Sequence, residues 1–106
     1  MPFPEVDKLW TFTSSGVGTP IDGVGVREWT FHLNWAVGST GTVEMQTAIN
    51  MTSTQAVVLG SSQVVTSSAG SAAVLQFSGP FAAIWPRVVT MTGGSSGTIT
   101  VRGIGN

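Results

Sequence analysis

The stretch REWTFHLNWAV, residues 27–37, decides the fold class of this chain. Its even positions are mostly polar, and its odd positions carry the apolar residues Trp29, Phe31, Leu33, Trp35 and Val37. Successive side chains of a β-strand point to opposite faces of the sheet, so this period of two predicts a strand with one buried and one polar face. We therefore expect the large side chains of this stretch to lie in the core.

A second run with the same period follows the turn sequence GSTG at residues 38–41. Its apolar positions are again odd, from Val43 to Met51, while Glu44 and Gln46 take even positions. Two such runs separated by a short glycine-containing turn predict a long hairpin. In that hairpin Glu28 and Glu44 would meet on the polar face as two solvated carboxylates.

The rest of the chain contains short apolar runs separated by Gly, Ser and Pro, and no window shows helical periodicity. About seven or eight strands with glycine-rich turns predict an all-β fold, an antiparallel two-sheet β-sandwich that is jelly-roll-like. The sandwich domain is expected over residues 9–106. Pro2 and Pro4 predict that residues 1–8 form an extended N-terminal arm. Pro86 predicts an edge or a bulge in its strand, because proline cannot donate to a ladder.

The composition excludes several functions. Only 8% of the 106 residues are charged, and four basic residues in a net charge of −1 leave no electrostatic basis for nucleic-acid binding. Without cysteine and with one histidine, the chain cannot use thiolate catalysis, disulfides or a His/Cys zinc site. We expect no cofactor, no membrane helix and no secretion signal.

The candidate catalytic residues point away from an enzyme. His32 lies on the polar face of its predicted strand with Glu28 and Asn34, where a solvated surface histidine is the expected interpretation. Asp22 together with Glu5 and Asp7 offers oxygen ligands for calcium, but without the spacing of a calcium loop. A small hydrolase would need a paired acid and base, which the sequence does not supply.

The tryptophans and the scarcity of charge favour an interaction protein. Trp10 and Trp85 are open to three roles: core residues, sugar platforms or subunit contacts. With one lysine in the chain, the strand edges are expected to be covered by neighbouring subunits or a larger assembly. The predicted assembly contacts are Pro2, Phe3, Pro4, Trp10, Trp85 and Arg87.

The C-terminal third, SGPFAAIWPRVVTMTGGSSGTITVRGIGN, resembles the ending of small all-β virion proteins of tailed bacteriophages, of the capsid decoration (cement) or fibre type. The segment REWTFHLNWAVGSTGTVEMQTAI looks like the strand pair that these proteins place earlier in a jelly roll. The resemblance implies a non-enzymatic protein of the virion that contacts the capsid or another virion protein. It also implies that Arg87 is a structural residue and that the protein forms a homo-oligomer, with a trimer as the favoured state. The alternative is a carbohydrate-binding jelly-roll module that binds a glycan.

Overall fold

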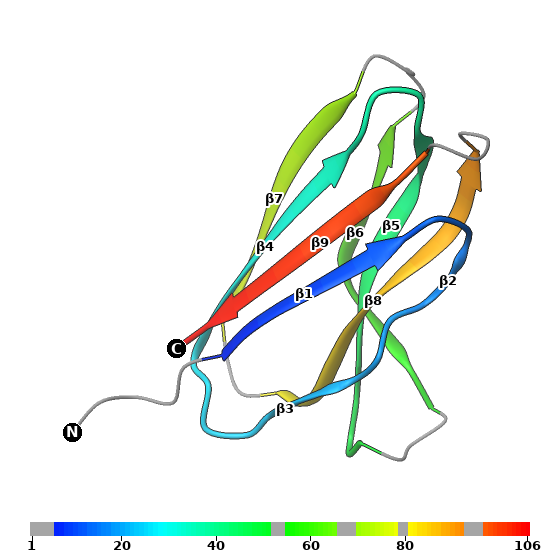
Figure 1. Cartoon of the computed structure of the whole chain (residues 1–106). Coiled ribbons are helices and arrows are strands. Elements are labelled where there is room, and N and C mark those ends of the chain that lie inside the picture. The colour runs from blue at the N-terminus through cyan, green and yellow to red at the C-terminus, as the bar shows by residue number, and fades with distance from the viewer. Residues whose placement is uncertain (1–5, 52–54, 66–69, 79–80, 93–96) are drawn as a thin grey trace.

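The computed structural model describes residues 6–51, 55–65, 70–78, 81–92 and 97–106, which form two antiparallel sheets packed face to face (Figure 1). The described residues contain no helix, and therefore none that is long and apolar enough to cross a membrane. The prediction of an all-β, two-sheet β-sandwich is confirmed.

Each sheet is built from strands that are distant in sequence. Sheet A has the order β1 (Val6–Phe12), β9 (Ile99–Gly105), β4 (Glu28–Trp35) and β7 (Ser71–Ser78). Sheet B has the order β2 (Gly16–Val17), β8 (Phe81–Thr92), β5 (Thr40–Ala48) and β6 (Val57–Val65), and β3 (Ile21–Gly23) also pairs with β8. When β2 and β3 are taken as one interrupted strand, this strand order is that of a jelly roll.

The predicted hairpin between residues 27–37 and 43–51 is wrong. β4 pairs with β7 and β9, whereas β5 pairs with β6 and β8. The chain between them crosses from sheet A to sheet B through a turn in which Gly38 has a φ of 92° and the Ser39 N–H donates to the Ala36 carbonyl (2.9 Å). Both strands bury their odd positions in the same core from opposite sides, so alternation alone does not distinguish a hairpin from this crossing.

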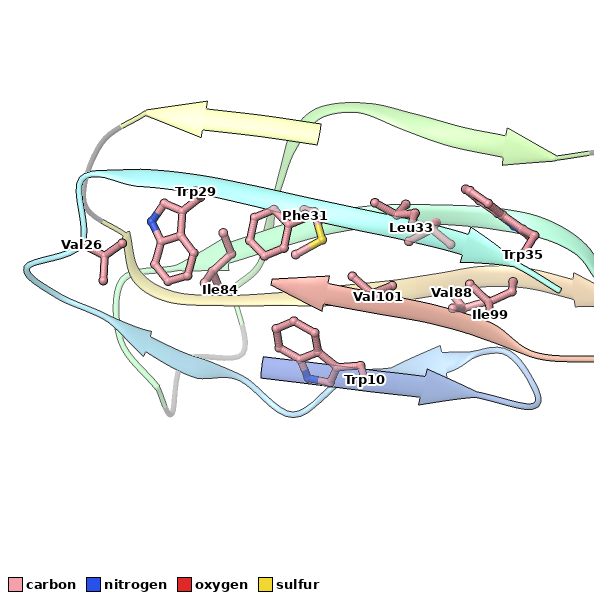
Figure 2. Packing of buried hydrophobic residues seen from close by; sticks show 12 residues of the cluster. Trp10, Val26, Trp29, Phe31, Leu33, Trp35, Ile84, Val88, Ile99 and Val101 are labelled. Atoms are coloured by element: carbon pink, nitrogen blue, oxygen red, sulfur yellow. The ribbon is translucent and has the colours of Figure 1, made fainter. Parts of the chain in front are cut away.

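The core lies between the two sheets, as Figure 2 shows for the inward side chains of β1, β4, β8 and β9. The buried set includes the predicted residues Trp29, Phe31, Leu33 and Trp35. The rings of Trp29 and Phe31 are stacked with centroids 5.8 Å apart. The apolar alternation of the sequence extends past the ends of β4 and β5. Its last residues, Val37, Ile49 and Met51, are exposed and do not belong to the core.

Two boundaries differ from the sequence predictions. β1 begins at Val6, so residues 6–8 belong to sheet A and not to an arm. Two short apolar stretches, residues 57–59 and 64–65, lie in the single strand β6, because a bulge around Gly60 absorbs the residues between them. Gly60 has a φ of 66°, a left-handed conformation that glycine adopts without steric cost.

Pro86 lies in an interior strand, at a place where no hydrogen-bond donor is required. Its carbonyl accepts the N–H of Gly18 (2.8 Å), in the break between β2 and β3. The N–H and C=O of a strand residue point to the same side, so the missing donor also faces this break. The predicted edge or bulge is therefore not found at Pro86 itself: the proline pairs with Met45, and the bulge of β8 lies at Val89, opposite the step from Thr42 to Val43. A Cβ at Gly18 would lie 2.9 Å from both the Pro86 ring and the Trp10 indole, which only glycine avoids.

Candidate functional site

The outward face of sheet B carries a buried cluster of polar and aromatic side chains, and this cluster is the candidate functional site. The register places Glu44 beside Arg87 and Gln46 beside Trp85 on adjacent strands β5 and β8. Residues paired in this way have side chains on the same face of a sheet. Trp85 and Glu44 are 6% and 7% exposed although they point away from the main core.

Trp85 occupies this face because its neighbours are small. It forms a second buried apolar cluster with Ala48 and Ala83, which leave room for the indole beside them. Its Nε1–H donates to the Gln46 side-chain oxygen (2.8 Å). A buried indole N–H that is hydrogen-bonded costs little, so burial of Trp85 stabilises the sheet.

The Glu44 carboxylate accepts hydrogen bonds from three side chains. Gln46 Nε2 donates to Oε1 (3.1 Å), Arg87 Nη1 also donates to Oε1 (3.2 Å), and Ser62 Oγ donates to Oε2 (3.4 Å). The bulge of β6 sets residues 60–62 opposite Glu44, which brings the Ser62 hydroxyl within hydrogen-bond distance of the carboxylate. A carboxylate held by three donors is suited to fixing neighbouring strands.

The arrangement does not pair an acid with a base. His32 is exposed on the outward face of sheet A, where its cross-strand neighbours are Arg102 and Val74. Glu44 lies on the outward face of sheet B, so both sheets separate the two side chains. The expected meeting of Glu28 with Glu44 is also wrong, because β4 and β5 belong to different sheets and Glu44 is buried in an ion pair.

The described acidic residues do not gather into a metal site. Asp22 Oδ1 accepts the N–H of Val24 (2.9 Å), and Asp7 binds the Arg102 guanidinium. No group of three His, Cys, Asp or Glu side chains able to hold a metal ion occurs among the described residues. Glu5, the third ligand of the calcium alternative, lies outside them.

The structure separates the predicted assembly contacts. Pro2, Phe3 and Pro4 lie outside the described residues. Trp10 is 6% exposed within the main core, where its Nε1–H donates to the Thr19 carbonyl (3.0 Å). Trp85 and Arg87 share one face, as their spacing predicts, and only Arg87 keeps substantial exposure.

The aromatic platform of a sugar site is absent from these positions. All four tryptophans of the chain are buried, including Trp10 and Trp85, for which a sugar platform was one of the open roles. A shallow depression of about 290 Å³ on the outward face of sheet B is lined mainly by threonines: Thr40, Thr42, Thr90 and Thr92. It has no charged or aromatic lining residue that would orient a ligand.

Sequence reasoning missed the buried roles of Glu44 and Gln46, because polar residues at alternating positions indicate a solvated face. A signal was present in the partner strand, where FAAIWP at residues 81–86 is an unbroken apolar run. Such a run is typical of a strand that is buried on both faces.

Comparisons with known proteins support the fold. No family model matches the chain, and no curated protein matches its sequence. Among solved structures, the chain is similar to the crystal structure of the SPBc2 prophage-derived protein YomS, with a TM-score of 0.59 and 20% sequence identity. The similarity covers 99% of this chain and 96% of YomS, so the two share one architecture along their whole length.

Proposed function

We propose that this chain is a non-enzymatic structural protein of a tailed-bacteriophage virion, where it decorates or stabilises the capsid through protein–protein contacts. The observation that carries the proposal is the likeness of architecture, over nearly the whole chain, to a protein described as prophage-derived. The shared architecture supports the proposal by analogy of fold, and it agrees with the resemblance of the C-terminal third to virion proteins.

The side chains add a second, independent support. The Glu44 carboxylate is engaged by Arg87, Gln46 and Ser62, and His32 lies on the opposite outward face. These groups are placed to stabilise strands and not to move a proton between each other. The apolar side chains Leu9, Val24 and Val58 are exposed, and such residues gain from burial against another protein.

The proposal is tested on the virion itself. Mass spectrometry of purified virions of the phage that encodes the chain is expected to find it as a structural component. The full-length chain is also expected to co-sediment with isolated empty capsids in a saturable manner, and the His32→Ala variant should bind equally well. Absence from virions together with no capsid binding would contradict the proposal. Retention on a glycan array without capsid binding would favour the carbohydrate-binding alternative.

A further inference from the structure

The charged residues divide the sandwich into two unlike flanks. From Met45 to Pro86 the sequence contains no Asp, Glu, Lys, Arg or His. These residues include all of β6 and β7, which are the edge strands on one side, where the Phe77 ring lies against Gly60. We call this side the uncharged flank. The charged flank is the other side, formed by β1, β2 and β3 (Figure 1).

The two sheets have four edges, and three of them are protected against pairing with another chain. β1 carries Asp7 and Lys8, and the edge formed by β2 and β3 is broken between residues 18 and 20. β6 is interrupted by its bulge at Gly60. Charges, short strands and bulges are the usual devices that prevent edge-to-edge association.

β7 has none of these devices. Its eight residues, SAAVLQFS, contain no charge and no proline, and they pair with β4 from Ser71 to Ser78 without a register shift. The inward side chains of Ala73, Leu75 and Phe77 remain half-buried, because none of the described strands covers them on the outer side. A regular edge with incompletely buried apolar side chains is a template for a further strand.

We propose that β7 pairs antiparallel with β7 of a second copy of this chain, around a two-fold axis that passes beside Leu75 and joins the two copies of sheet A into one continuous sheet. A second copy fits this edge because neither β7 carries a charge that would repel the other. A two-fold contact uses the same patch on both subunits, so the patch must be complementary to itself.

The side chains fix the register of this contact. Directly opposite residues in an antiparallel pair have side chains on the same face, so inward residues must meet inward residues. With Leu75 opposite Leu75 of the second copy, Phe77 lies opposite Ala73, a large residue against a small one. On the outward face, Val74 then lies opposite Gln76.

This inference concerns contacts between copies of the chain and does not depend on the proposed role in the virion. It replaces the trimer that the resemblance implies with a dimer, because a two-fold contact closes after two subunits. Capsid binding is measured separately, so either proposal can fail alone.

The test places charges at two outward positions of β7, Val74 and Gln76, which are exposed and outside the core. In V74K/Q76K, lysines face each other twice across the axis, and we expect association to weaken by roughly tenfold or more. In V74K/Q76E each lysine faces a glutamate of the other copy, so the dimer should persist. The variant T11K/I104K adds two lysines to the same outward face away from β7 and should also remain dimeric.

Sedimentation velocity of the full chain measures the oligomeric state, and circular dichroism checks the fold of each variant. Amide hydrogen exchange provides a second measurement, because protection of β7 amides should rise with the concentration of the unaltered chain. A monomer or a trimer for the unaltered chain overturns the proposal. So does a V74K/Q76K variant that dimerises as tightly as V74K/Q76E, or β7 protection that is independent of concentration.

Discussion

On β4 the outward-pointing side chains of His32 and Asn34 are exposed, whereas on β5 and β8 the outward-pointing Glu44 and Trp85 are buried. The sequences of β4 and β5 show the same alternation of apolar and polar residues. The difference arises from what lies beside each residue: an open sheet surface around His32, and small alanines together with the β6 bulge around Trp85 and Glu44. The comparison teaches that alternation identifies the inward face of a strand and leaves the burial of its outward face undetermined.

The largest expected effect is on the outward face of sheet B. Trp85→Ala should lower the free energy of unfolding by about 3–5 kcal/mol, because it removes a buried indole and leaves a cavity beside Ala48 and Ala83. Urea denaturation measures this loss. The matched control is Leu9→Ala on the exposed outward face of sheet A, where the change should stay within about 0.5 kcal/mol. Equal losses in the two variants would remove the contrast between the faces.

Glu44→Gln should cost about 1–2 kcal/mol, because the neutral amide weakens the charge-assisted hydrogen bond from Arg87 while it preserves the shape of the side chain. Glu28→Gln is its control on sheet A, where an exposed carboxylate accepts one hydrogen bond from Ser78 Oγ (3.0 Å). There the stability should change by less than about 0.5 kcal/mol. A Glu44→Gln variant as stable as the unaltered chain would mean that the buried network adds nothing to stability.

A smaller effect is expected for the ion pair on sheet A. Hydrogen bonds from Arg102 Nε and Nη2 are the main cause that holds the pKa of Asp7 below the ordinary value of 3.8. Desolvation opposes this shift, and the charge of Arg102 adds to it more weakly. A lowered pKa in the folded state contributes stability above the unfolded pKa, and this contribution is lost as the pH falls through the folded pKa.

The stability difference between the unaltered chain and Asp7→Asn should therefore be present near neutral pH and shrink below the ordinary carboxyl pKa. Because both side chains are exposed, added salt should also reduce it. Urea midpoints of the two proteins at neutral and at acidic pH give the comparison. A difference that grows on acidification would have the wrong sign for this pair.

The smallest effect is expected for His32→Ala. His32 is exposed beside Val74 and Arg102, so its removal should change the free energy of unfolding by less than about 0.5 kcal/mol and leave the dimer intact. Thermal unfolding and sedimentation velocity check both outcomes. If the unaltered chain hydrolysed a substrate and a folded His32→Ala variant did not, sheet A would carry a catalytic site, which would contradict the proposal of a non-enzymatic protein.

These contrasts also mark how far the sequence predicts the structure. The inward residues of β4 and the class of fold follow from alternation, because a strand with Trp29, Phe31 and Leu33 on one face has one way to bury them. The partners of β4 do not follow, since the hydrophobic pattern of β5 suits a hairpin and a crossing equally well. The apolar run at residues 81–86 indicates that the outward face around Trp85 is buried, but it does not identify what covers the indole, because Ala48 comes from another strand.

The position of β9 has a consequence for synthesis on the ribosome. β9 is the last strand of the sandwich in chain order, yet it lies between β1 and β4 in sheet A, and it pairs Gly105 with Val6. At translation rates of about 5–20 residues per second, the apolar faces of β1 and β4 wait on the order of several seconds for their common neighbour. A nascent chain of this protein therefore exposes the side chains of Trp10 and Trp29 before sheet A can close, and this interval is when a chaperone would have access to them.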